Sequence, residues 1–160
     1  MEVALFEPRI PQNTGNVART CAAFNIPLNL IEPLGFKLED KYLKRAGLDY
    51  WPLVNVNNFE NFDKFFGSKA QKRIISFSKK NGIYLNDFKF QKDDVLLFGR
   101  EDSGLPDSII DKSDFLISIF MPNLQTGNNK KKGVRSLNLS VACGIAIYEA
   151  NKQINFQNCN

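Results

Sequence analysis

The chain has 160 residues, of which 43% are hydrophobic and 24% charged, and it contains no histidine. This length favours one soluble domain whose core is large enough to fold without disulfides or a structural metal. The absence of histidine excludes Ser-His and Cys-His nucleophile pairs and every His-ligated metal site. No apolar run reaches the roughly 18 residues of a membrane span, so a cytoplasmic location is expected. The formal net charge of +4 only weakly favours an anionic partner.

Three cysteines, Cys21, Cys143 and Cys159, lie far apart and form no CxxC pair. Cys21 and Cys143 fall on apolar faces of predicted helices, so we expect both to be buried, reduced thiols. The sequence therefore predicts no zinc and no other metal.

The first half of the chain alternates strand-like and helical patterns. Val3–Phe6 is predicted to be a strand, and Asn13–Asn25 a helix capped by Asn13 or Thr14. Leu28–Ile31 is predicted to be the next strand. Leu38–Ala46 is predicted to be a helix that Gly47 ends.

The second half continues this alternation. Phe59, Phe62 and Phe66 predict a short amphipathic helix, and strands follow at Arg73–Phe77, Val95–Phe98 and Phe115–Ile119. The last helix carries an apolar stripe of Leu137, Val141, Ile145 and Tyr148, with Ser136 as its cap. We predict a single domain over residues 1–153 and a frayed tail over residues 154–160. The fold class is α/β, with a mostly parallel sheet and flanking helices.

Ligands of parallel α/β sheets bind beyond the carboxyl ends of the strands, which directs attention to the loops after Phe6, Phe77, Phe98 and Ile119. No GxGxxG motif is present, which excludes a dinucleotide dehydrogenase. Gly99 and Gly104 have the spacing of a P-loop, but Leu105 and Pro106 follow where lysine and a hydroxyl residue are required. An NTPase is therefore excluded.

Three segments of these loops carry the polar residues that could serve chemistry: NTGNVAR at residues 13–19, FGREDSGLP at 98–106 and RSLNLSVA at 135–142. Each has a purely structural interpretation when taken alone. Asn13 and Ser136 could cap helices, and Arg19 could pair with a carboxylate. Their occurrence together, in this order, favours a shared functional site.

The three segments resemble motifs 1, 2 and 3 of the SPOUT methyltransferases. The likeness runs from Met1 to about Gln153 and is strongest for the minimal TrmL (YibK) group, through EPRIPQNTGN at residues 7–16 and RAGLDY at 45–50. The resemblance implies a C-terminal deep trefoil knot, an exception to the rule that chains do not thread loops. It also implies a homodimer whose RNA site is shared between protomers. The stripe of the last helix would then supply part of the dimer interface, although packing within the core of one chain is the alternative.

The resemblance further implies methylation of the ribose 2′-hydroxyl of the tRNA wobble nucleotide (cytidine or uridine 34, with leucine tRNAs as expected substrates), using S-adenosylmethionine and no metal. The donor pocket would be formed by Phe77, Gly99, Ile119, Met121, Ser136 and Leu137. We expect Gly99 to allow close approach of the backbone to the donor. The alternatives are another tRNA or rRNA position, or a knotted RNA-binding module without activity.

The residues expected to serve catalysis are Arg19, Asn13, Glu101, Ser136 and Asn138. Arg19 is also expected to bind RNA, together with the adjacent cations Lys130, Lys131 and Lys132, for which a solvated loop is the alternative. The chain departs from the family pattern in two places. Residues 122–132 form a longer loop than expected, and Phe120 stands where the family commonly has proline.

Overall fold

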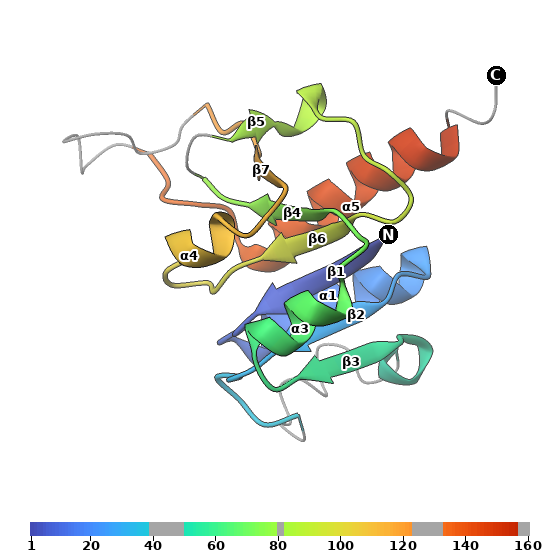
Figure 1. The fold of residues 1–160 in the computed structure, drawn as a ribbon, viewed down its shortest axis with the longest axis vertical. Coiled ribbons are helices and arrows are strands. Elements are labelled where there is room, and N and C mark those ends of the chain that lie inside the picture. The colour runs from blue at the N-terminus through green and yellow to red at the C-terminus, as the bar shows by residue number, and fades with distance from the viewer. Residues whose placement is uncertain (39–49, 80–81, 123–132, 157–160) are drawn as a thin grey trace.

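The fold is a seven-stranded parallel sheet covered by helices on both faces (Figure 1). The computed structural model describes residues 1–38, 50–79, 82–122 and 133–156. Its strands are β1 (Glu2–Phe6), β2 (Leu28–Ile31), β3 (Val56–Phe59), β4 (Ile74–Phe77), β5 (Ile83–Tyr84), β6 (Val95–Phe98) and β7 (Phe115–Ser118). They lie in the order β3-β2-β1-β6-β4-β7-β5, and each neighbouring pair is parallel. The predicted α/β class is confirmed.

The sheet divides the core into two layers, one on each of its faces. The α-helices are α1 (Pro11–Phe24), α3 (Phe62–Ser68), α4 (Asp107–Ile110) and α5 (Leu139–Phe156), and short 3-10 turns lie at η1 (Trp51–Leu53) and η2 (Leu85–Asp87). α1 and α5 pack on one face of the sheet through Val17, Cys21, Cys143 and Ile147. α3 and α4 cover the opposite face. β1, β2, β4 and β6 are buried along their whole length, as central parallel strands are.

The buried thiols follow the prediction. Cys21 and Cys143 are free and fully buried between α1, α5 and the sheet. Burial raises the pKa of the Cys21 thiol to about 12 and raises that of Cys143 as well, so neither thiol is reactive near neutral pH. Cys159 lies outside the described residues.

Several predicted boundaries were wrong. α1 begins at Pro11, and Ile10 occupies its cap position, so Asn13 and Thr14 are buried within the first turns rather than capping them. Phe59 belongs to β3, not to the helix that follows it. α5 begins three residues after Ser136, and Asn138 accepts a hydrogen bond from the Ser140 N–H at 2.9 Å in place of the predicted cap.

The ends of two other predicted segments also differ. Leu38 lies in a turn, and the rest of the helix predicted over Leu38–Ala46 falls outside the described residues. α5 runs to Phe156, into the segment expected to be frayed, and Ile154 packs against the core. Within the described residues, no helix combines the length and apolarity needed to cross a membrane.

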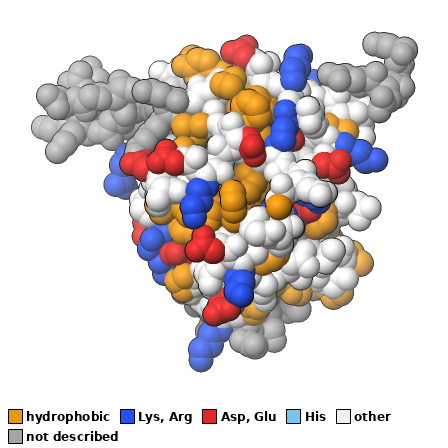
Figure 2. All heavy atoms as spheres, in the orientation of Figure 1, with side chains coloured by type: hydrophobic (Ala, Val, Ile, Leu, Met, Phe, Trp, Pro, Cys, Tyr) orange, Lys and Arg blue, Asp and Glu red, His pale blue; other side chains and the backbone are white. Residues whose placement is uncertain are grey.

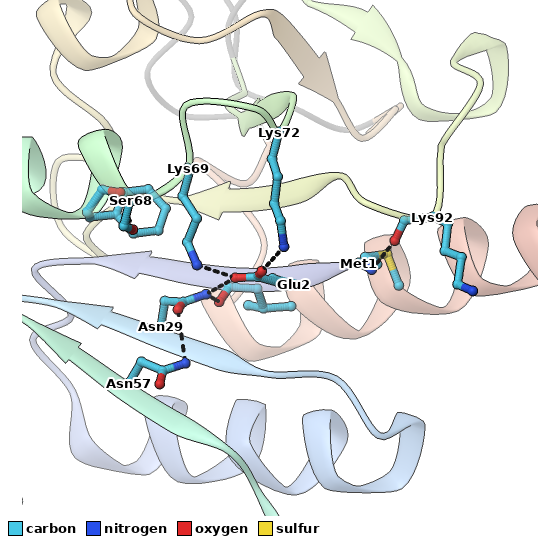
Figure 3. Close-up of polar contacts among 10 residues, drawn as sticks. Met1, Glu2, Asn29, Asn57, Ser68, Lys69, Lys72 and Lys92 are labelled. Carbon is cyan, nitrogen blue, oxygen red and sulfur yellow. Dashed lines mark hydrogen bonds and ion pairs between the residues drawn. The ribbon is translucent and has the colours of Figure 1, made fainter.

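A buried ion cluster lies at the amino end of β1, opposite to the carboxyl ends of the strands. The Glu2 carboxylate accepts hydrogen bonds from Lys69 Nζ at 2.6 Å, from Lys72 Nζ, and from Asn29 Nδ2 at 2.9 Å (Figure 3). Burial raises the pKa of Glu2, but these hydrogen bonds outweigh burial and lower it from 4.5 to about 2. The cluster fastens the loop after α3 to the sheet.

We expect the Glu2→Gln variant to lose about 3 kcal/mol of unfolding free energy at neutral pH, because Lys69, only 11% exposed, would keep its charge without a counter-ion. The native pKa of Glu2 is depressed, so its stabilisation is complete above pH 4.5 and disappears as the pH falls toward 2. Urea titrations at pH 7 and pH 3 should therefore show that acid lowers the unfolding free energy of the variant less than that of the parent. Asp63→Asn, at an exposed ion pair with Lys112, is the control and should change little. Equal acid sensitivity of Glu2→Gln and the parent would contradict this assignment.

Candidate active site

A cavity of about 400 Å³ opens beyond the carboxyl ends of β4, β6 and β7, where α1 and α5 begin. Its walls come from segments that are far apart in the sequence, including the three loops singled out above. The lining residues are Ile10, Asn13, Phe77, Ser78, Lys79, Phe98, Gly99, Arg100, Glu101, Asp102, Ser103, Gly104, Leu105, Ile119, Met121, Ser136, Leu137, Asn138, Leu139 and Ala142. This volume is within the range of small-molecule and cofactor clefts.

All six residues predicted to form a donor pocket line this cavity: Phe77, Gly99, Ile119, Met121, Ser136 and Leu137. Sequence reasoning missed Phe98, whose ring stacks on that of Phe77 with centroids 4.5 Å apart and planes at 14°. The two rings give the cavity a rigid apolar wall. The loop after β6 and Asn138 supply polar groups to the cavity lining. Apolar walls with a few convergent polar groups suit a nucleoside-type ligand such as S-adenosylmethionine.

Gly99 is required by the loop itself. A Cβ atom at this position would lie 2.2 Å from the carbonyl carbon of Gly104 and 2.3 Å from the nitrogen of Leu105. The loop folds back on itself through a pair of hydrogen bonds between Arg100 and Gly104, and Gly104 adopts a φ of +75°. The close approach is thus to the chain's own backbone, not only to a ligand as the sequence suggested.

A chain of hydrogen bonds joins the three motifs. Asn138 Nδ2 donates to Asn13 Oδ1 at 2.9 Å, and Asn13 Nδ2 donates to Glu101 Oε1 at 3.1 Å. Glu101 also accepts the backbone N–H groups of Arg9 at 2.8 Å and Ile10 at 3.1 Å, just before α1. The carboxylate therefore holds the start of α1 and fixes both asparagine amides. Such saturation suits a positioning residue, because three donors already fix the orientation of this carboxylate.

A second carboxylate, that of Glu7, pairs with two arginines near this chain of hydrogen bonds. Glu7 directly follows β1 with a φ of 46°, an uncommon conformation for a residue other than glycine. Its Oε2 pairs with Arg9 at 3.2 Å and with Arg100 at 3.5 Å. This group was not predicted from the sequence, although Glu7 directly follows one predicted strand and Arg100 is the second residue after another.

Arg19 lies apart from the cavity. It is exposed on α1, and its guanidinium carbon is 4.7 Å from the centre of the Tyr50 ring. Arg19 is six positions after Asn13, which corresponds to about 9 Å along a helix. The cavity of one chain therefore brings together Asn13, Glu101, Ser136 and Asn138 but not Arg19. Lys130, Lys131 and Lys132 lie outside the described residues.

The described part of the chain holds no cluster of metal-binding side chains. Among these residues, no group of three or more Cys, Asp or Glu side chains could hold a metal ion. The polar side chains that line the site are amides, hydroxyls, the carboxylates of Glu101 and Asp102, and the cations of Lys79 and Arg100.

Comparison with known proteins identifies the class. The model of the SpoU rRNA Methylase family matches residues 1–148, so the chain belongs to this family of SPOUT methyltransferases. The fold is accordingly the SPOUT fold with its C-terminal knot, as the resemblance implied.

Similar proteins narrow the relationship. The tRNA (cytidine(34)-2′-O)-methyltransferase of Saccharophagus degradans is 40% identical over 154 residues, which cover 96% of each chain. A solved structure concerned with 2-OH methylation of C/U34 on tRNA superposes with a TM-score of 0.86 at 44% identity, covering 95% of this chain and 94% of that one. The AdoMet-bound rRNA methyltransferase of Sinorhizobium meliloti shares the fold, with a TM-score of 0.80 at 23% identity over 94% of this chain and 55% of that one.

Proposed function

We propose that this protein transfers a methyl group from S-adenosylmethionine to the ribose 2′-hydroxyl of cytidine or uridine 34 in tRNA, with leucine tRNAs among its substrates. The observation that carries the proposal is the cavity joined to the Asn138–Asn13–Glu101 chain, built from the three motifs of this family. Full-length similarity to a tRNA (cytidine(34)-2′-O)-methyltransferase supports the wobble position. This function places the protein in the cytoplasm.

S-adenosylmethionine supplies an electrophilic methyl group bound to a sulfonium. The 2′-oxygen attacks this carbon in line as the bond to sulfur breaks, so alignment of the two reactants supplies much of the acceleration. Ser136 and Asn138 stand at the cavity and are expected to orient the ribose, while Asn13 and Glu101 hold Asn138 in place.

The 2′-hydroxyl is a weak acid, and Arg19 is expected to assist its reaction. A guanidinium stays protonated at ordinary pH, which makes it unsuited to accept the proton. As a fixed cation it can instead bind the neighbouring phosphate and stabilise negative charge that develops on the 2′-oxygen. The hydroxyl proton then leaves to solvent or to that phosphate.

A homodimer explains why Arg19 lies outside its own cavity, because a second copy can bring its Arg19 to the site. The surface available for this contact is the apolar stripe of α5, where Val141 is 49% and Tyr148 60% exposed and Ile145 lies between them. The opposite side of α5 packs in the core, so the stripe is free for a partner.

Light scattering is expected to give twice the chain mass of 18.2 kDa. Ile145→Glu should yield a monomer that has lost methylation, because a buried carboxylate in the interface has no partner. Lys64→Glu adds a carboxylate to exposed α3 on the opposite face and should leave the dimer and the activity unchanged. A monomer with full activity would contradict the shared site.

The function itself is tested in cells and with purified protein. Nucleosides of tRNA from a deletion strain should lack 2′-O-methylcytidine or 2′-O-methyluridine at position 34 by mass spectrometry. Calorimetry in EDTA should show binding of S-adenosylmethionine, since the described residues offer no metal site. Loss of the modification at another tRNA or rRNA position would revise the substrate. RNA binding without any lost modification would favour the inactive module.

A further inference from the structure

We infer that Tyr84 and Phe120 form a stacking platform for an unpaired nucleobase that flanks the nucleotide to be methylated. The inference rests on the proposed function and assigns to that site a second point of contact with RNA. The two rings meet edge to face, with centroids 5.7 Å apart and planes at 90°. Both are exposed, Tyr84 to 52% and Phe120 to 64%, although large aromatic side chains are mostly buried in folded domains.

The platform adjoins the cavity because of the strand register. Tyr84 in β5 pairs with Ser118 at the end of β7, and Phe120 follows two residues later. Side chains alternate along an extended segment, so Phe120 lies on the side of Ser118 while Ile119 and Met121 face the other way. Ile119 and Met121 line the cavity. One stretch of backbone thus separates the platform from the site of reaction.

The surroundings favour a nucleobase as the occupant. Ile83 next to Tyr84 is also exposed, so apolar side chains gather over the β5 edge of the sheet, as the upper part of Figure 2 shows. Lys79, in the segment that connects β4 to β5, is exposed and lines the cavity, so its ammonium is available to a phosphate. Aromatic rings beside a cation are the combination that binds single-stranded nucleic acid, because every base has a π-face. The proposed self-association surface is on α5, which covers one face of the sheet and is distinct from this edge strand.

The platform also accounts for Phe120, which the sequence comparison with the family left unexplained. A proline at this position could not present a flat aromatic ring. We therefore expect this protein to bind the nucleotide beside its target more tightly than do relatives that have proline at this position.

The test compares aromatic and aliphatic side chains at the two positions. RNA affinity of Phe120→Leu and Tyr84→Leu should fall about 5- to 100-fold, while Phe120→Trp and Tyr84→Phe should retain it. The slope of log Kd against log salt should stay unchanged, because stacking releases no counter-ions. An anticodon stem-loop with 2-aminopurine beside position 34 should show fluorescence quenching with the parent and not with Phe120→Leu. Phe66→Leu, an exposed aromatic residue on α3, is the matched control and should behave like the parent.

Two results would overturn the platform. One is an RNA affinity of the Tyr84→Leu/Phe120→Leu double variant equal to that of Phe66→Leu. The other is a double variant that changes the molecular mass in light scattering, since the pair would then belong to a contact between copies. The proposed function is tested separately, by locating the methyl group that the parent protein adds to tRNA.

Discussion

Replacing Arg19 with lysine or alanine is expected to lower the single-turnover rate of methylation at saturating RNA by at least about a hundredfold. Lysine keeps the positive charge but loses the planar fork that can hold a phosphate and the ribose oxygen together. The Tyr50 ring, 4.7 Å from the Arg19 guanidinium carbon, also favours a flat cation at this place. Saturating RNA removes any contribution of weaker RNA binding from the measured rate.

Donor binding provides the control for Arg19. Arg19 does not line the cavity, so calorimetry should give both variants the parental affinity for S-adenosylmethionine. If Arg19 acts only by attracting RNA, lysine restores most of the rate and the defect appears in RNA affinity alone. A lysine variant with near-parental rate would remove Arg19 from the catalytic residues and direct attention to Glu101.

Gly99→Ala is expected to weaken donor binding by about 10- to 100-fold without unfolding the protein. The new methyl group would lie 2.2 Å from the Gly104 carbonyl carbon, so backbone must shift and break the Arg100–Gly104 hydrogen bonds. Overpacking of this kind costs about 1–3 kcal/mol. Here the backbone that must shift lines the cavity, so the cost appears as weaker donor binding.

Gly67→Ala is the matched control for Gly99→Ala. Nothing lies within 4 Å of a Cβ at Gly67, and the residue is in α3, so alanine should leave donor binding unchanged and slightly favour the helix. Circular dichroism should show both variants folded. Parental donor affinity in a folded Gly99→Ala variant would mean that the loop after β6 does not shape the donor pocket.

The sequence predicted the strands that are buried on both faces, because a continuous apolar run is a strong signal. It missed β3, in which Asn57 and Asn58 stand where apolar residues would mark a strand, and β5, which has only two residues. Asn57 is explained by tertiary structure, since its side chain donates to Asn29 beside the Glu2 cluster. Phe59 was assigned to a helix because its spacing to Phe62 is helical, although it ends a strand.

The composition of the candidate site was more predictable than its geometry. The motifs identified the walls of the cavity, because loops after neighbouring parallel strands must meet. They did not reveal that Asn13 and Asn138 hydrogen-bond to each other across 125 residues, since such pairing depends on how α1 and α5 pack. Nor could spacing show that Arg19 lies outside the lining of the cavity. Pro11 was an available signal for the start of α1, because proline is favoured in the first turn of a helix.

The most direct test of the proposed function uses a tRNA that lacks a single atom. The assay combines purified protein with S-adenosylmethionine that carries a labelled methyl group. Two tRNAs are compared: one is unmodified, and the other has 2′-deoxyribose at nucleotide 34. The unmodified tRNA should take up one methyl group per molecule, located at the ribose of nucleotide 34 by mass spectrometry of nuclease fragments. The 2′-deoxy tRNA should bind equally well and take up none, because the acceptor oxygen is missing. Equal methylation of both tRNAs would contradict the function proposed here.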